Sequence, residues 1–546
     1  MTETEVTSSE PPTAPEPRTL SGERFEPVVA LILGLIAVLA LVIIGRPGPP
    51  PPATGAAALV PSDALAYVNV SLDRHRPAVR QAVKLAERFP DFPLAAAAVQ
   101  SRIGAILAGG HSVDFSGQIG PWLGNEASLA LLNTATSTAG SLLVLDVRNP
   151  TRARAFLRAH GATAHGSYRG TPLLVYPTAS ELAFVSHFLV LGQDTSVRAA
   201  IDVNAGSTRS LAGSAVYQRA VARESSGRVL DAYASLAGVQ RVLTAQGGVL
   251  AALGALLYQP ALEGVAISLS PASGGARVQL HSALDPSLAR ISPAATTFAP
   301  TLQKVMPTGS ILMLDVVGLD RVAPSLLNAG AAAGVAGGIA PLLSRLGSAL
   351  ASEGVNVHDL TSIFSGETAV AIVAPTGSPT LVVVARTAHE AQVRTELAQL
   401  QIPLVQLFTP PNAPAGKAPV FTDRTVAGIA AHQLVLSRGL QFDYAVFHGL
   451  VVISTSLEGI AAFAPHSHAL TGDPGYRLAL GARPARLTSL VYLDFRRLLA
   501  LGRQTGFIRS ARVKALLADL ERLTSIGLSS TRSPGESSAQ LFIRVP

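Results

Sequence analysis

The longest apolar run of the chain lies near its N-terminus. Val28 to Ile44 (VVALILGLIAVLALVII) carries no polar side chain, and Glu26 and Arg46 bound it. As a helix, these 17 residues would cover roughly 26 Å, close to the thickness of a bilayer's hydrocarbon core. The pattern predicts a transmembrane helix over residues 27–45 that contacts the lipid bilayer through residues 28–44.

A cleaved signal peptide is the alternative for this run. Signal peptides have shorter apolar regions of roughly 7–15 residues, and here Arg46 and a run of prolines at 49–52 make a poor cleavage context. We therefore favour an uncleaved signal-anchor. Arg18 and Arg24 precede the run, which biases the N-terminus weakly toward the cytoplasm.

This anchor sets the expected arrangement along the chain. Residues 1–26 are polar and proline-rich, typical of a disordered cytoplasmic tail. Residues 46–58 read as a Pro-rich linker, semi-rigid where prolines run together. The body that follows is expected outside the cytoplasm, at the cell membrane of a bacterium.

Two further apolar stretches are too short for a confident span. Residues 247–257 and 329–343 are rich in Ala and Gly, and Pro341 interrupts the second. Both are interpreted as helices of the body. Insertion of 329–343 into the membrane as a hairpin stays open as an alternative.

The body is predicted to consist of two copies of one unit, that is, an internal duplication. Matching segments occur in the same order in both halves. They are Val60–Asp73 with Met306–Asp320, Gly124–Ala127 with Ser365–Thr368, Leu182–Gly192 with Asp443–Ser454, Tyr217 with Tyr476, and Val265–Leu280 with Gly527–Leu541. The spacing between matches is near 240 early in the unit and 259–261 later, which places an insertion in the proline-rich segment Pro403–Phe421. We therefore expect repeats over residues 59–300 and 301–546.

Each repeat has the pattern of an α+β unit. Alternating runs predict strands at 64–72, 127–132, 141–147, 171–176, 182–191 and 229–236, with a closing hairpin over 264–283. Helices are expected at 75–108, after Asn149-Pro150, from Asp194 to about Asn204, at 217–222 and at 240–258. Hairpins dominate, so the predicted fold class is α+β, with each unit a mainly antiparallel sheet and helices on one face.

Composition narrows the class of protein. The chain has 546 residues, 48% of them hydrophobic and 14% charged, with no cysteine. This excludes long polyelectrolyte disorder, disulfide scaffolds and thiol catalysis. The net charge of +7 comes from 42 basic residues, 38 of them arginines. No basic run or basic–aromatic motif accompanies it, so we expect no nucleic-acid partner.

Several of these segments together resemble a known family. They are Val60-Pro61 with Ala66-Tyr67-Val68, Leu123–Ala127, Asp146-Val147 with the helix around Ala153–Leu157, Ala183–Gly192, and Leu211-Ala212 with Tyr217. The pattern is similar to the bacterial family catalogued as domain of unknown function 3352, over nearly all of 58–546. The resemblance implies an N-terminal membrane segment and a long extracytoplasmic body, with no assigned site residues.

Glu126 and Glu367 are the first candidate site residues. Each follows a glycine and enters a strand at an equivalent place. They could form a paired acid site, but a repeated position favours carboxylates that accept backbone N–H groups near a turn.

The remaining candidates are weaker. His187 and His448 are expected at exposed hairpin tips, and His466-Ser467-His468 has HxH spacing without a third ligand nearby. Gly334–Gly338 lacks the lysine of a phosphate loop, and no G-x-S-x-G motif occurs. Trp122 is expected to be a packing residue. We therefore assign no catalytic, cofactor-binding or metal-binding residue.

The sequence leaves three functions open. A non-catalytic binding or scaffold role in the cell envelope is favoured, because a groove between two repeats is a common ligand site. A carrier or sensor of a lipid or other hydrophobic ligand is the second. An enzyme with a dispersed, unrecognised site is the third.

Overall fold

A computed structural model describes most of the body of the chain. The described residues are 52–133, 140–243, 261–291, 296–319, 363–374, 378–408, 418–437, 440–465, 468–504, 517–533 and 535–546. The predicted anchor at 28–44, residues 46–51 of the linker, the segments 247–257 and 329–343, and Gly334–Gly338 lie outside them. Among the described residues, no helix has the length and apolar character needed to cross a membrane.

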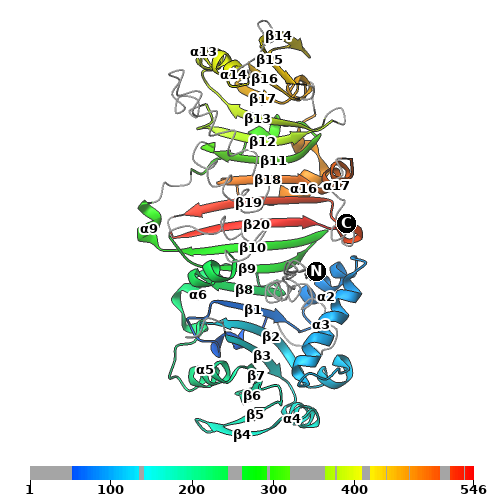
Figure 1. Ribbon diagram of the computed structural model, residues 1–546, viewed down its shortest axis with the longest axis vertical. Helices are drawn as coiled ribbons and strands as arrows, with labels where there is room; N and C mark the ends of the chain where they lie inside the picture. Colours follow the sequence, from blue (N-terminus) through cyan, green and yellow to red (C-terminus); the bar gives the residue numbers. More distant parts are fainter. Residues whose placement is uncertain are drawn as a thin grey trace, which may run out of the picture.

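Twenty strands form one sheet in which every pairing is antiparallel (Figure 1). Their bounds are β1 Ala66–Ser71, β2 Leu123–Leu132, β3 Gly140–Val147, β4 Thr163–Tyr168, β5 Thr171–Val175, β6 Glu181–Val185, β7 Phe188–Gly192, β8 Leu230–Ser235, β9 Leu262–Ala272, β10 Gly275–Leu284, β11 Ser310–Val317, β12 Glu367–Val373, β13 Thr380–Arg386, β14 Phe421–Val426, β15 Ile429–Ser437, β16 Leu440–Phe447, β17 Leu450–Ser454, β18 Ser489–Asp494, β19 Ser525–Ser533 and β20 Glu536–Arg544.

The strands follow one another across the sheet in the order β4-β5-β6-β7-β3-β2-β1-β8-β9-β10-β20-β19-β18-β11-β12-β13-β17-β16-β15-β14. The prediction of a separate sheet in each half is therefore corrected. The last strand of each half, β10 and β20, pair with each other and join the two halves edge to edge.

The β10–β20 pairing is centred on two glutamines. Gln279 lies opposite Gln540, and the register runs from Gly275 opposite Arg544 to Ala283 opposite Glu536. Outward from this pair, each half continues with its strands in the same chain order. The centre of the sheet is thus the place where segments far apart in sequence meet.

The helices lie between the strands in the chain. They are α2 Pro77–Ala86, α3 Phe92–Leu107, α4 Pro150–Ala159, α5 Asp194–Asn204, α6 Ala215–Val221, α7 Leu236–Gly238, α9 Pro286–Ile291, α13 Glu390–Gln399, α14 Gln401–Phe408, α15 Leu457–Ala461, α16 Pro474–Leu480, α17 Phe495–Gln504 and α19 Leu517–Leu520.

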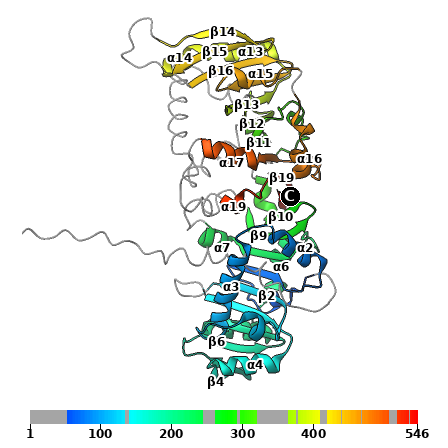
Figure 2. The same cartoon turned by 90° about the vertical axis from the view of Figure 1, so that its right-hand side faces the viewer.

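Helices cover both faces of the sheet, which corrects the expectation of one covered face. Figure 2 shows α6 and α16 on one side of the sheet and α17 and α19 on the other. Tyr217 of α6 packs with Ala266 of β9 in one core, whereas Leu269 of the same strand packs with Val79 of α2 in another. Ala266 and Leu269 differ by an odd number of positions, so their side chains point to opposite faces.

Local sequence explains why these elements start where they do. Asn149 accepts a hydrogen bond from the Arg152 N–H at 3.0 Å, and Pro150 opens α4, as predicted for an N-cap followed by proline. The β4 strand was not predicted, because its residues (TAHGSY) are polar and mostly exposed without alternation. Residues 55–58, assigned to the linker by the sequence, form a 3-10 turn in which Ala56 and Ala57 are buried.

Candidate functional site

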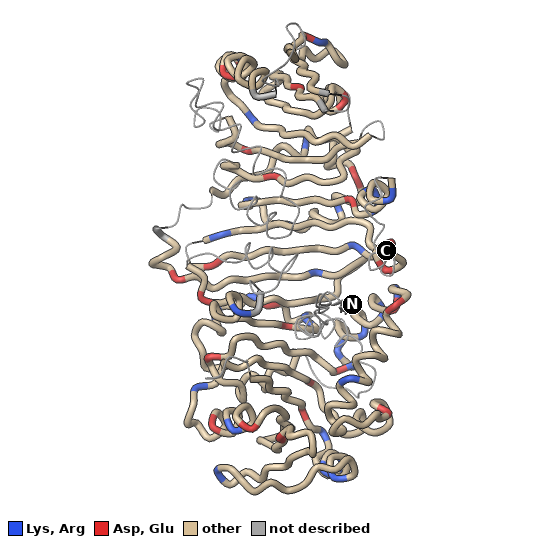
Figure 3. Tube along the Cα trace, in the orientation of Figure 1, with Lys and Arg blue, Asp and Glu red and all other residues tan. Residues whose placement is uncertain are grey.

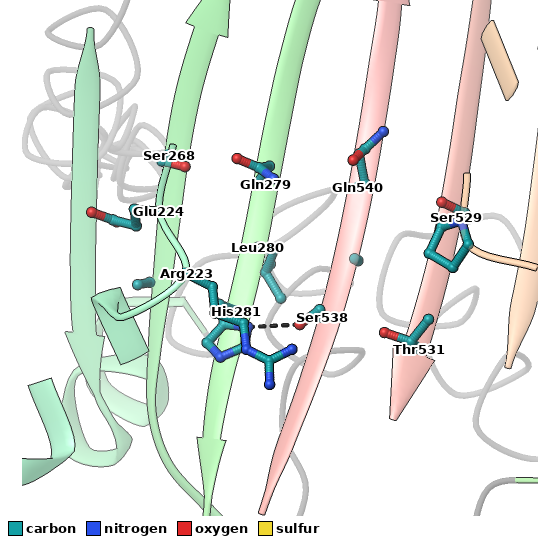
Figure 4. A pocket seen from close by; sticks show the side chains of 13 residues that line it. Arg223, Glu224, Ser268, Gln279, Leu280, His281, Ser529, Thr531, Ser538 and Gln540 are labelled. Carbon is teal, nitrogen blue, oxygen red and sulfur yellow. Dashed lines mark hydrogen bonds between the residues drawn. The ribbon is translucent and has the colours of Figure 1, made fainter. Parts of the chain in front are cut away.

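A pocket of about 150 Å³ lies on the face of the sheet that α6 and α16 cover, over the four central strands β9, β10, β20 and β19 (Figure 4). It is lined by Arg223, Glu224, Ala266, Ser268, Gln279, Leu280, His281, Pro484, Ser529, Thr531, Ser538, Ala539 and Gln540. Its walls therefore come from both halves of the chain. Hydroxyl, amide and imidazole groups lie on its floor, while apolar atoms make up most of its surface.

Strand register places these polar groups side by side. Ser268 lies opposite Gln279, Gln279 opposite Gln540, and Gln540 opposite Ser529. Directly opposed residues of antiparallel strands point to the same face. One row of polar side chains therefore crosses the four central strands beneath the pocket.

The row continues into the first half of the sheet. Asp231 lies opposite Ser268, Asn69 opposite Asp231, and Ser128 opposite Asn69. The Ser128 hydroxyl donates to the Asn69 side-chain oxygen at 2.8 Å. In the second half Leu490 interrupts the row next to Ser529. The polar row is thus longer on the β1 side of the pocket.

His281 is held by two partners at one end of the pocket. Its Nδ1 lies 2.6 Å from the Ser538 hydroxyl, and its Nε2 lies 3.3 Å from a carboxylate oxygen of Glu536. Arg223 forms an ion pair with the other oxygen of Glu536. Burial lowers the pKa of His281 below its ordinary value, against the opposing effect of Glu536. A neutral ring that donates from Nε2 to Glu536 accepts a hydrogen bond at Nδ1 from the Ser538 hydroxyl.

This group has the residue types of a Ser–His–acid triad but not its surroundings. Ser538 lies within β20, which pairs with β10 on one side and β19 on the other. The backbone N–H groups of such a central strand are used in pairing and are not available as oxyanion donors. The geometry accordingly suits hydrogen bonding to a ligand better than acyl transfer.

The pocket wall near α6 contains a buried charge cluster. Arg228 Nε lies 3.0 Å from Glu224 and 3.1 Å from Asp231. Burial, and then the charge of the neighbouring Asp231, raises the pKa of Glu224, and burial raises that of Asp231. Two carboxyls share one guanidinium here, so the wall facing the pocket is largely neutralised.

Four polar atoms on β9 and β10 are buried without a hydrogen-bond partner among the described residues. They are Ser268 Oγ, Ser270 Oγ, Arg277 Nε and Gln279 Oε1. Ser268 and Ser270 are 1% and 5% exposed, and they lie opposite Gln279 and Arg277. Buried polar groups in folded proteins nearly always have a partner, water included. This cluster is where the structure has unused hydrogen-bonding capacity beside a cavity.

Glu126 and Glu367 do not line the pocket. Glu126 accepts the Ala56 N–H at 3.0 Å, and Glu367 accepts the Leu302 N–H at 2.8 Å. Each carboxylate thus holds the short turn that precedes the first strand of its half, as expected for carboxylates near a turn. Burial raises the pKa of Glu126 to about 7.

His187 and His448 lie on exposed turns, as predicted. His187 is in the β6–β7 turn and His448 in the β16–β17 turn, near opposite ends of the sheet (Figure 1). His466 and Ser467 fall outside the described residues. In the described ranges no three His, Asp or Glu side chains come together as a metal site would require.

Trp122 is a packing residue, as predicted. It is 1% exposed, and its ring lies 5.8 Å from that of Phe156.

The pocket residues were missed by sequence reasoning. Polar residues alternate along both closing hairpins, for example Gln279 and His281 on β10 and Ser538 and Gln540 on β20. That alternation could have indicated a polar sheet face. The sequence could not show that β10 and β20 pair, and this pairing is what assembles the site.

The fold and pocket define a class: an α+β protein built on one large open antiparallel sheet, with a polar site at its centre. The chain belongs to the family described as "Protein of unknown function (DUF3352)", which it matches over residues 27–545. No curated protein matches the sequence.

Solved structures of the Treponema protein TP0453 show distant similarity. Crystal form I has 12% identity and a TM-score of 0.26, covering 46% of this chain and 89% of TP0453. Crystal form III has 11% identity and a TM-score of 0.26, covering 47% and 90%. Similarity at this level carries no inference about function.

Proposed function

We propose that the protein is a single-pass, membrane-anchored, extracytoplasmic binding protein of the bacterial cell envelope, and that its central pocket binds a small polar ligand. The observation that carries this proposal is the group of buried, unpartnered polar atoms on β9 and β10 beside the pocket, above all Ser268 Oγ and Gln279 Oε1. A ligand with several hydroxyl, amide or charged groups would supply the missing partners.

A non-catalytic role agrees with the chemistry of the site. His281 and Ser538 are in contact, but sheet pairing consumes the backbone donors around them. The carboxyls of the wall are committed to Arg228 and Arg223. The side chains are therefore arranged to hold a ligand.

The envelope location rests on the sequence. The apolar run at 28–44 remains the proposed anchor, with the N-terminus in the cytoplasm. Ala53 accepts a hydrogen bond from Asn69 of β1, so the chain enters the body beside this strand. An anchored body of this kind would present its pocket near the outer surface of the membrane.

Carriage of a hydrophobic ligand is the second candidate. On the sheet face opposite the pocket, Val278 lies opposite Leu541, and these are flanked by Leu269 and Leu528. All four side chains are only partly buried. Such a row of apolar groups could contact an acyl chain.

The two candidates are separated by what co-purifies with the full chain. We would extract the chain from membranes of a bacterium of its own kind in mild detergent, and measure native mass spectra and solvent extracts. Ser538→Trp fills the pocket, while Ser537→Trp places the same bulk on the opposite face of β20. A polar ligand lost only in Ser538→Trp supports the pocket proposal. A lipid lost only in Ser537→Trp favours the carrier, and no ligand in any sample contradicts both.

Duplication of one ancestral unit belongs to this proposal. It is supported by the common strand order of the two halves and by matched contacts. The Tyr217–Tyr233 and Tyr476–Tyr492 ring pairs both have centroids 5.2 Å apart. A duplicated unit would explain why the pocket forms on both sides of the β10–β20 junction.

A further inference from the structure

Arg277 stands out among the charged residues near the pocket, although it lies just beyond the residues that line it. It lies on β10 two positions before Gln279, so both side chains point to the pocket face of the sheet. Its Nε is buried without a hydrogen-bond partner, and no ion pair involving it occurs among the described residues. Two nearby arginines are committed: Arg223 pairs with Glu536, and Arg228 with Glu224 and Asp231.

The groups next to Arg277 are hydroxyl and amide groups. Ser270 lies directly opposite it on β9, and Ser268 lies opposite Gln279. Both hydroxyls are buried and unpartnered in the described part of the chain. A guanidinium beside hydroxyl and amide donors is the donor set that proteins use for a tetrahedral oxyanion.

We propose that the pocket recognises a ligand bearing a phosphate group, with Arg277 as the residue that sets this specificity. This inference rests on the proposed binding function and names its ligand class. The phosphate would accept from the guanidinium and from the Ser268 and Ser270 hydroxyls. The Gln279 and Gln540 amides would bond hydroxyl groups on the rest of the ligand. The phosphate could belong to a soluble ester or to a lipid headgroup, which are chemically alike at this site.

The polar groups differ between the two ends of the proposed site, which would fix the orientation of a bound ligand. Arg277, just beyond the residues that line the pocket, lies opposite Phe542 on β20, whereas the pocket residue His281 lies opposite Ser538. One end therefore offers an uncommitted positive charge and the other a neutral imidazole and hydroxyl. A ligand with one anionic and one neutral polar end would bind in a single orientation.

The test is isothermal titration calorimetry on the full chain in a non-ionic detergent. The probes are inorganic phosphate, glycerol 3-phosphate, glycerol, and short-chain phosphatidylglycerol in mixed micelles. We expect saturable binding of at least one phosphate-bearing probe. Arg277→Gln should weaken that binding by at least tenfold, and Arg277→Lys by less, because it keeps the charge but loses the planar fork.

Arg532→Gln is the matched control, since Arg532 lies on β19 with its side chain on the opposite face from Ser529 and Thr531. It should leave the affinity unchanged. Binding of glycerol 3-phosphate would point to a soluble ester, and binding of phosphatidylglycerol alone to a lipid headgroup. Either result supports the proposal if Arg277→Gln abolishes it.

Two results would overturn the inference. One is the failure of every phosphate-bearing probe to bind. The other is binding that Arg277→Gln and Arg532→Gln affect equally. If the polar ligand that co-purifies is retained by Arg277→Gln but lost in Ser538→Trp, the phosphate inference fails while the binding function stands. If Ser538→Trp also has no effect on any ligand, both fail together.

Discussion

At the scale of single residues, the two halves carry different side chains at the same position of the fold. Asn69 on β1 and Asp315 on β11 each lie between the second and the eighth strand of their half, and both are fully buried. Asn69 has hydrogen-bond partners, whereas Asp315 has none for its carboxyl oxygens among the described residues. Burial, and then the nearby Glu367, raises the pKa of Asp315 to about 8.

This shift predicts that Asp315 makes stability depend on pH. Its ordinary pKa is 3.8, so between about pH 4 and pH 8 the native state keeps a proton that the unfolded chain has lost. Stability must therefore fall as pH rises through this window. Asp315→Asn removes the titration, and its stabilisation relative to the wild type should grow from pH 4 to pH 8. One pKa unit corresponds to about 1.4 kcal/mol, so several kcal/mol are expected at the upper end.

Thermal unfolding midpoints of both proteins across this pH range measure the effect. Asp63→Asn, at an exposed turn position, is the control and should behave like the wild type. A midpoint difference for Asp315→Asn that stays constant with pH would contradict the burial argument. Glu126 titrates in both proteins and cancels in the comparison.

Gly238 carries a second prediction at this scale. A Cβ at this position would lie 1.7 Å from the Leu65 carbonyl oxygen, which is backbone and cannot move aside. Gly238→Ala should therefore destabilise the protein by roughly 1–3 kcal/mol, as overpacking does. At Gly472 a Cβ meets nothing within 4 Å, so Gly472→Ala is the matched control. Equal unfolding midpoints for the two variants would show that the contact between α7 and Leu65 is looser than described.

At the scale of elements, the N-cap of α4 gives a local test. The Asn149 side chain is the cap acceptor, so Asn149→Ala should cost about 1 kcal/mol. Asn149→Ser keeps an acceptor and should lose much less. Hydrogen exchange of the first turn of α4 reads out the difference, with faster exchange in Asn149→Ala only. Similar exchange in both variants would mean that packing of Phe156 and Leu157 holds the helix without its cap.

The same scale shows what the sequence could predict. Apolar alternation placed β1, β8 and the β9–β10 hairpin within a few residues, because one buried face imposes a period of two. β4 was not predicted from the sequence because it is an exposed edge strand, and its hydrogen bonds come from its partner β5. The sequence also did not predict that helices cover both faces of the sheet. A strand buried on both faces has an apolar sequence without alternation, which does not indicate what covers each face. The pocket depends on β10 meeting β20, a long-range pairing that no local pattern encodes.

At the scale of the whole molecule, the charged residues are dispersed along the chain. Figure 3 shows acidic and basic residues scattered along the trace, the central strands included. At its middle, strand pairing and polar contacts such as the Arg223–Glu536 ion pair join the two halves. The β10–β20 ladder is the one strand pairing between the two halves in the described residues.

That ladder is antiparallel and centred on two equivalent glutamines, which leads to a prediction for the separated halves. β10 and β20 have the same spacing from Gln279 and Gln540, so each edge could pair with a copy of itself in the same register. A fragment covering residues 52–291 should therefore form a dimer through two β10 strands, with Gln279 opposite Gln279. Size-exclusion chromatography with light scattering should give twice the fragment mass.

Charge reversal at the centre tests the register. Gln279→Lys places like charges opposite each other in the fragment dimer and should weaken it, while a mixture with Gln279→Glu should restore a heterodimer. In the full chain the lysine faces Gln540 instead, so Gln279→Lys should leave the fold intact. A fragment that stays monomeric at all concentrations would argue that contacts beyond the ladder join the halves. A dimer insensitive to both charges would place the interface elsewhere than β10.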